Sequence, residues 1–137
     1  MPLTEKERAQ QIKQFIETLK PHVTGFSQSF QMHGKQRDEV TCGGRVKYVV
    51  DTGKMHDNLN DRIVYVTLDD EVGEILIVIP SIFWDNLHAK IGDIVIARGV
   101  LYSPEKECTF ESKAGGIIKI IRENDPFRVL VKSIYKL

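Results

Sequence analysis

The sequence predicts an all-β fold with helices, built as a five-stranded Greek-key barrel with an N-terminal amphipathic helix. Three observations support this fold class. After residue 40, several runs alternate apolar and polar residues at strand spacing. Short clusters of turn-forming residues separate these runs, as in small barrels and sandwiches. A short helix interrupts the series between the third and fourth predicted strands.

The N-terminal helix is predicted over residues 4–20. Thr4 followed by Glu7 is a capping-box start, because the Thr hydroxyl can accept from a first-turn N–H. Pro21 ends the run. The apolar residues of this helix recur at helical spacing and form one stripe: Ala9, Ile12, Phe15, Ile16 and Leu19. We expect the stripe to pack on the barrel or to close one of its ends. A partner-binding or dimer-forming helix is the alternative.

Residues 22–39 are polar and are interrupted by Gly25 and Gly34. They predict a connecting arm that contains at most one short strand and no recognisable catalytic or binding motif. The chain therefore divides into residues 1–39, the helix and connecting arm, and residues 40–137, the barrel.

The first strand begins at Val40, and Gly43-Gly44 within it indicates a bulge or tight bend. Its alternation predicts one face with Val46, Tyr48 and Val50 and the other with Arg45, Lys47 and Val49. The second strand, residues 63–68, is predicted to point Val64, Val66 and Leu68 inward and Ile63, Tyr65 and Thr67 outward.

Residues 69–73 predict a hairpin turn in which Gly73 takes a positive φ. The third strand, residues 74–79, ends at Pro80, and Ser81 is the expected N-cap of a short helix over residues 82–89.

The fourth strand is predicted over residues 94–101. Residues 103–116 predict a long loop or an extra hairpin, followed by a short strand at 117–121 and a closing strand at 127–134.

The charge balance limits what the chain can bind tightly. The 137 residues contain 19 basic and 19 acidic side chains, so the formal net charge is zero. Phosphate binding needs a local basic stripe rather than a basic total. Any nucleic-acid binding should therefore be modest and sensitive to salt.

No cofactor or metal is expected. Cys42 and Cys108 stand far apart and indicate neither a disulfide scaffold nor a thiolate zinc site. The polar run at residues 56–61 does not meet calcium-loop spacing and reads as a turn. No apolar run approaches the ~20 residues that a membrane-spanning helix requires. The polar N-terminus lacks the features of a signal peptide, so we expect a cytoplasmic protein with no membrane contact.

Two consecutive segments carry a family resemblance: YVTLDDEVGEILIVI at residues 65–79 and PSIFWDNLHAKIGDIVIARGVL at residues 80–101. Together they resemble the OB module of the alpha subunit of bacterial replicative DNA polymerase III and of the class II aspartyl, asparaginyl and lysyl tRNA synthetase anticodon-binding domains. The resemblance covers residues 40–137 and is densest over 62–101. It implies an OB-fold, a small barrel that most often binds single-stranded nucleic acid on one face.

The resemblance also implies a binding site. In the synthetase members, an aromatic residue at the position of Tyr65 stacks on a base from the outer face of the second strand. Tyr65 is therefore the leading stacking residue, and Arg45 and Lys47 on the neighbouring strand are expected to meet phosphates. Thr67 shares the outward face with Tyr65. The loops flanking this face would add basic residues to it: Lys54, Arg62, Lys106 and Lys113.

Leu76 stands where the synthetases place a polar base-reading side chain, so sequence-specific anticodon reading is not expected. The chain also has no room for a synthetase or polymerase catalytic domain. We therefore expect a non-catalytic single-stranded nucleic-acid-binding protein, not an enzyme, with DNA favoured over RNA. The polymerase resemblance implies a role in replication, recombination or repair.

Two alternatives remain open. The first is an OB-fold protein-interaction or oligomerisation module that docks a partner, or a second copy, through helix 4–20 or through exposed apolar residues such as Val49 and Leu76. The neutral net charge favours this reading. The second is a retroviral-like aspartic protease, because residues 49–53 match the hydrophobic-hydrophobic-Asp-Thr-Gly pattern of that class. Lys54 departs from that pattern, since a small residue is expected there.

Overall fold

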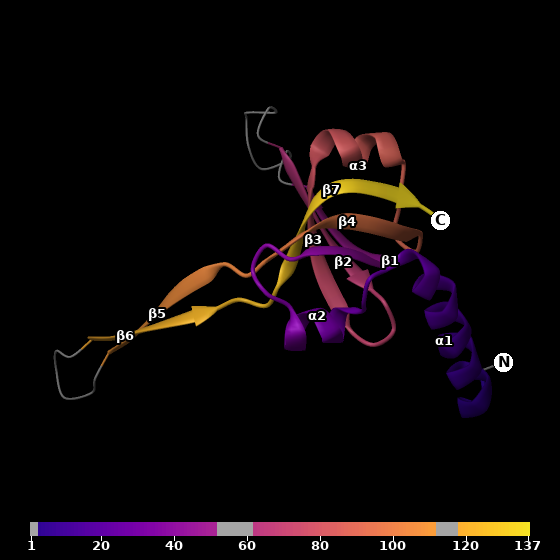
Figure 1. The fold of residues 1–137 in the computed structure, drawn as a ribbon, viewed down its shortest axis with the longest axis horizontal. Coiled ribbons are helices and arrows are strands. Elements are labelled where there is room, and N and C mark those ends of the chain that lie inside the picture. The colour runs from indigo at the N-terminus through magenta and orange to yellow at the C-terminus, as the bar shows by residue number, and fades with distance from the viewer. Residues whose placement is uncertain (1–2, 52–61, 112–117) are drawn as a thin grey trace.

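The computed structural model describes residues 3–51, 62–111 and 118–137, and the side chains among them outside residues 105–124. Five strands form a closed barrel in the order β1-β2-β3-β7-β4 (Figure 1). Their bounds are Glu39–Asp51 for β1, Ile63–Asp69 for β2, Glu74–Pro80 for β3, Ile94–Tyr102 for β4 and Arg128–Lys136 for β7. All neighbours are antiparallel except β3 and β7, which are parallel. The predicted five-stranded barrel is confirmed, and its strand order is compatible with an OB-fold.

The helices are α1 (Glu5–Leu19), the short 3-10 helix η1 (Lys20–His22), α2 (Ser27–His33) and α3 (Ser81–Leu87). The predicted N-terminal helix and the short helix between the third and fourth strands are confirmed. The hydroxyl of Thr4 accepts from the backbone N–H of Glu7 at 3.2 Å, as the capping-box pattern predicts. Ser81 is the first residue of α3 rather than its cap, which is Pro80.

Only the C-terminal half of α1 packs against the barrel. Phe15 and Leu19 are buried with Ile96 of β4, and the surrounding half-buried side chains are Val23, Phe26 and Ile94. The first two turns are exposed, and the helix runs away from the barrel (Figure 1). The apolar stripe therefore anchors one end of α1 and leaves the other end free of the barrel.

Helix α2 corrects the prediction of a connecting arm over residues 22–39. Its N-cap residue, Phe26, provides no side-chain cap. The cap comes instead from Asp70, distant in sequence, whose carboxylate accepts from the backbone N–H of Ser27 at 2.6 Å. Because the stabilising group lies 43 residues away, local sequence patterns did not reveal the helix.

The predicted register of β1 is wrong beyond Val46. The β1–β2 ladder shifts between Val46 and Tyr48, so the bulge lies at Lys47 rather than at Gly43-Gly44. As a result Tyr48 and Val50 point outward, with 59% and 47% of their surfaces exposed, while Val49 packs against the core. A one-residue slip reverses every side chain beyond it.

The residue with a positive φ in the turn between β2 and β3 is not the one predicted. Glu71 has the positive φ, 74°, and Gly73 does not. The side chain of Asp69 accepts from the backbone N–H of Glu71 at 2.8 Å and supports this conformation. A Cβ at Gly73 would lie 2.7 Å from the hydroxyl oxygen of Ser27 on α2, so a larger residue here would displace that buried side chain.

A two-stranded antiparallel sheet, β5 (Glu105–Glu111) and β6 (Ile118–Asn124), is inserted between β4 and β7. It extends away from the barrel (Figure 1). One strand does lie within residues 103–116, where a long loop or an extra hairpin was predicted, but it pairs with the strand predicted at residues 117–121, which the structure places at Ile118–Asn124. The base of this two-stranded sheet is closed by a hydrogen bond of 2.9 Å from the N–H of Asp125 to the carbonyl of Pro104.

The barrel interior is filled by aliphatic side chains from all five strands. Those with no exposed surface are Val64, Val66, Leu68, Ile77, Ile79, Val95 and Val129, with Ala97 beside them. This tight core fixes which residues of each strand face outward. Across the described ranges, none of the helices has the length and apolar character needed to cross a membrane.

Candidate nucleic-acid interface

Cross-strand pairing aligns outward side chains of β1, β2, β3 and β7 in two adjacent rows. The first row follows the pairs Val50–Tyr65, Tyr65–Val78 and Val78–Leu130. The second follows Tyr48–Thr67, Thr67–Leu76 and Leu76–Arg128. We call these eight residues the outer face: Tyr48, Val50, Tyr65, Thr67, Leu76, Val78, Arg128 and Leu130. All are exposed or half-buried, and most are apolar or aromatic.

Two tyrosines lie next to each other on the outer face. Tyr48 pairs with Thr67 and Val50 pairs with Tyr65, so the two tyrosines are diagonal neighbours on β1 and β2. Diagonal neighbours in an antiparallel pair lie roughly 7–8 Å apart, so each ring can present its own surface to a ligand. Tyr65 is half-buried, as expected for an aromatic residue supported by its strand neighbours. Tyr48 is the more exposed of the two.

The two predicted cations of β1 are engaged by carboxylates. Arg45 Nη1 lies 2.7 Å from Glu71 Oε1, and its guanidinium lies 3.9 Å from the centroid of the Phe15 ring on α1. Lys47 Nζ pairs with Glu74 Oε1 and lies 5.5 Å from the centroid of the Tyr48 ring. The hydrogen bond and charge of Glu74 raise the pKa of Lys47 above its ordinary value. These cations thus border the outer face without giving it a net positive charge.

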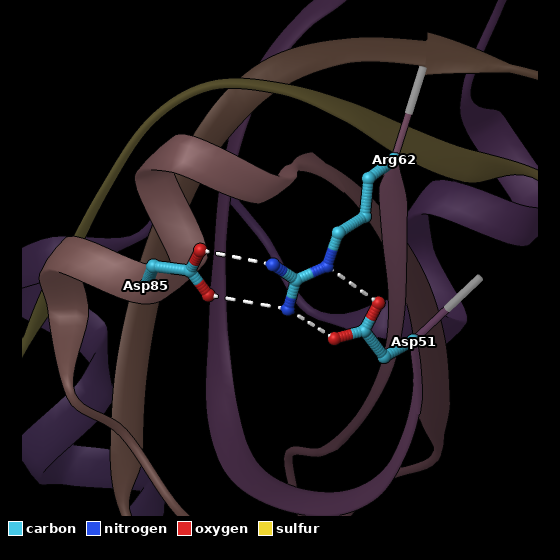
Figure 2. Close-up of polar contacts among 3 residues, drawn as sticks. All are labelled: Asp51, Arg62 and Asp85. Carbon is cyan, nitrogen blue, oxygen red and sulfur yellow. Dashed lines mark hydrogen bonds and ion pairs between the residues drawn. The ribbon is translucent and has the colours of Figure 1, made fainter. Parts of the chain in front are cut away.

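Arg62 lies between two carboxylates (Figure 2). Its Nε donates to Asp51 Oδ1 at 2.8 Å, its Nη2 donates to Asp51 Oδ2, and its Nη1 donates to Asp85 Oδ2 at 3.1 Å. The hydrogen bonds that Arg62 donates to Asp51 are the main reason that the pKa of Arg62 is raised. The side chain therefore ties the end of β1 to the start of β2 and to α3.

This arrangement bears on the protease alternative. Asp51, which would be the catalytic acid, is engaged at both oxygens by the Arg62 guanidinium. Thr52 and Gly53, the other two residues of the motif, lie outside the described residues. The contacts of Asp51 are those of a structural ion pair at the end of a strand.

Arg128 belongs to the outer face and was not selected from the sequence. It pairs with Leu76 of β3 and with Tyr102 of β4. Its Nη2 lies 3.8 Å from Asp125 Oδ2, and its buried Nε has no hydrogen-bond partner. Because Nε is buried, a ligand would meet the terminal nitrogens of this side chain, which is 23% exposed at the base of the β5–β6 sheet and is a candidate contact for an anionic group.

The remaining predicted site residues are placed as follows. Thr67 is half-buried on the outer face between Tyr48 and Leu76. Lys106 lies in β5, where only the backbone is described. Lys54 and Lys113 lie outside the described residues, as does the polar run at 56–61. Among the residues that are described, no cluster of three or more His, Cys, Asp or Glu is arranged to hold a metal ion.

The outer face can therefore stack flat rings and bury apolar surface, and the predicted cations that the structure describes in full at its border, Arg45, Lys47 and Arg62, are held in ion pairs. No family model and no curated protein matches the chain. The fold that the structure establishes is the closed barrel with its N-terminal helix.

Proposed function

We propose that this chain is a non-catalytic protein that binds single-stranded nucleic acid on its outer face, mainly by base stacking. The observation that carries the proposal is the adjacency of Tyr48 and Tyr65 within an apolar, solvent-accessible surface on β1 and β2. In OB-folds this part of the barrel is the usual binding surface for oligonucleotides. The resemblance to the polymerase module favours DNA over RNA, in replication, recombination or repair.

Stacking suits this surface because every base has an aromatic face, whatever its sequence. Each base–aromatic contact contributes about 1–3 kcal/mol in proteins that bind single strands. Two adjacent tyrosines could hold two bases, while Val50 and Leu76 extend the apolar surface on either side. The cross-strand neighbours of Tyr65 are Val50 and Val78, which have no polar side-chain group to read a base. This fits binding without sequence preference.

The ion pairs of Arg45 and Lys47 reduce the contribution of phosphate contacts to the free energy of binding. A phosphate that approaches Arg45 or Lys47 competes with Glu71 or Glu74. Arg128, whose side chain is 23% exposed and whose Nη2 lies 3.8 Å from Asp125, is the leading phosphate contact in this proposal. Binding should consequently depend less on salt than in proteins that use a track of free lysines and arginines.

A titration by fluorescence anisotropy tests the proposal. The probe is a labelled oligothymidylate of about 15 nucleotides, since an OB-fold covers roughly 4–16. We expect binding at low salt, and a loss of affinity of about 5- to 100-fold in Tyr48→Ala and in Tyr65→Ala. Tyr135→Ala removes an exposed tyrosine of β7 that is not part of the outer face and is the matched control. No binding at low salt, or unchanged affinity in both outer-face variants, would contradict the proposal.

The second candidate function is a protein-interaction module that uses the same surface. The observation in its favour is the engagement of Arg45, Lys47 and Arg62 by carboxylates, which leaves an apolar surface without free positive charge at these positions. Light scattering after size exclusion distinguishes the two. A dimer that Val50→Lys dissociates, together with no oligonucleotide binding, would favour this candidate.

A further inference from the structure

A groove lies between α3 and the C-terminal half of β7, elements that Figure 1 shows side by side. Its volume is about 410 Å³, within the range of pockets that bind small ligands or side chains. None of its lining residues belongs to the outer face, so the groove is a separate feature of the barrel.

Four of the eight described residues that line the groove are apolar or aromatic. Leu87 of α3 and Ile134 of β7 are half-buried and pack against the barrel core. Phe83 and Tyr135 flank them and remain 40% and 47% exposed. Tyr135 is held in place by η1, because its hydroxyl lies 3.0 Å from Nδ1 of His22. The groove therefore exposes an aromatic pair on a surface whose shape is fixed by the fold.

Both charged residues in the described lining of the groove are basic, and their carboxylate partners lie outside that lining. Among the residues that the structure describes, Lys132 and Lys136 line the groove and no carboxylate does. Lys132 Nζ lies 3.5 Å from Glu39 and Lys136 Nζ lies 3.9 Å from Asp93, and both lysine side chains are exposed. Ion pairs of this length and exposure contribute little to stability. A ligand carboxylate could therefore replace either partner at low cost.

We propose that this groove binds a short acidic peptide segment of a partner protein. Apolar side chains of the segment would insert between Phe83 and Tyr135, and its carboxylates would meet Lys132 and Lys136. The proposal rests on the apolar lining residues together with the charge complementarity at the rim. It does not depend on the proposed function, because the two surfaces share no residue.

The acidic turn between β2 and β3 of a second copy fits the groove less well than a separate partner does. The acidic turn of this chain, residues 69–71, combines acids with a neighbouring apolar residue, Val72. Its acids are already used within the molecule: Asp70 is buried against Ser27, and Glu71 pairs with Arg45. This turn is therefore not available as the acidic ligand.

Selection from a random peptide library against the full chain tests the proposal, followed by titration of the enriched peptide. We expect enriched sequences that combine acidic and large apolar residues. The double variant Lys132→Glu, Lys136→Glu should weaken binding of that peptide at least about tenfold, and Phe83→Ala should also weaken it. The double variant Lys6→Glu, Lys13→Glu makes the same change in net charge on exposed turns of α1 and should bind normally.

Three results would overturn the proposal. One is enrichment of peptides without acidic residues, or no enrichment. Another is an equal loss of binding in the α1 control, which would indicate net charge rather than the groove. The third is evidence that the groove binds a different class of ligand. A protein that forms a dimer, and loses it in Phe83→Glu, would indicate a second copy of the chain. Oligonucleotide binding that the groove variants lose and Tyr65→Ala retains would indicate a nucleic acid. Trp84 on α3 is the only tryptophan of the chain, so its fluorescence verifies that each variant is folded.

Discussion

Asp70 and Ser27 form two hydrogen bonds in the interior of the protein. Asp70 Oδ2 accepts from the backbone N–H of Ser27 at 2.6 Å, and Oδ1 accepts from the Ser27 hydroxyl at 2.9 Å. Each residue is only 2% exposed. The pair fixes the start of α2 to the turn between β2 and β3, where Asp70 also accepts from the N–H of Val72 at 3.2 Å.

Removing this carboxylate should destabilise the fold. Asp70→Ala leaves the buried N–H and hydroxyl of Ser27 without an acceptor, and each unsatisfied group costs about 1–3 kcal/mol. We expect a decrease of at least that size in the free energy of unfolding measured in urea. Ser27→Ala should cost less, because the backbone hydrogen bond remains. Glu5→Gln, on the exposed first turn of α1, is the control, and equal stability of Asp70→Ala and this control would contradict the account.

The buried thiol of Cys42 predicts a pH dependence. Burial, with a smaller effect of the Asp70 charge, raises the pKa of Cys42 from 9.0 to about 12. Between these values the folded chain keeps a proton that the unfolded chain has lost. The free energy of unfolding should therefore fall as pH rises through this window, by up to about 1.4 kcal/mol per pH unit, and be unaffected by this group below it.

Urea unfolding of the wild type and of Cys42→Ala at several pH values isolates this effect. Lysines and tyrosines also titrate in the window, so the informative quantity is the difference in stability between the two proteins. That difference should shrink as the pH rises above about 9. A difference that stays constant up to pH values near 12 would show that the thiol is not the responsible group.

Weakening the ion pairs beside the outer face should strengthen oligonucleotide binding. Glu74→Gln removes the partner of Lys47, and Glu71→Gln removes the partner of Arg45. We expect a several-fold gain in affinity at low salt and a steeper salt dependence, by about 0.7 in the logarithmic slope per added phosphate contact on a single strand. Glu17→Gln on the exposed side of α1 changes the net charge equally and should leave the slope unchanged. Equal behaviour of all three variants would indicate that the lysine and arginine do not contact the ligand.

The ion pairs of Arg62 predict a salt-sensitive contribution to stability. Arg62→Met leaves Asp51 and Asp85 near each other without the cation between them. The midpoint of thermal unfolding should fall, and the drop should be smaller at high salt, where the repulsion is screened. Arg8→Met, on an exposed turn of α1, is the control. A midpoint equal to that of the wild type at low salt would show that the pairs do not stabilise the fold.

Much of the fold could be predicted because the relevant signals are local. The alternation of residues 63–68 defines β2, and the capping box at Thr4 defines the start of α1. The register of β1 could not be predicted beyond Val46, because VKYVV has apolar residues on both faces. Helix α2 was missed because its cap is Asp70, a residue that only the folded chain brings to Ser27.

The candidate site was predictable only in part for the same reason. The pattern of its own strand predicts that Tyr65 points outward, and the family resemblance implies its stacking role, whereas Tyr48 joins it only because the bulge at Lys47 reverses the end of β1. Arg128 reaches the outer face through the parallel pairing of β3 and β7, which leaves no trace in the sequence pattern. The carboxylate partners of Arg45 and Lys47 likewise come from other elements.

Backbone NMR tests the central claim most directly, since it reports where an oligonucleotide binds rather than whether it does. A 15N-labelled sample of this 15.6 kDa chain is titrated with oligothymidylate and its amide shifts are followed. The account predicts that the changes centre on the outer face of β1, β2 and β3, including Tyr48, Tyr65 and Leu76. Shifts confined to the groove between α3 and β7, or no shifts at saturating ligand, would contradict it.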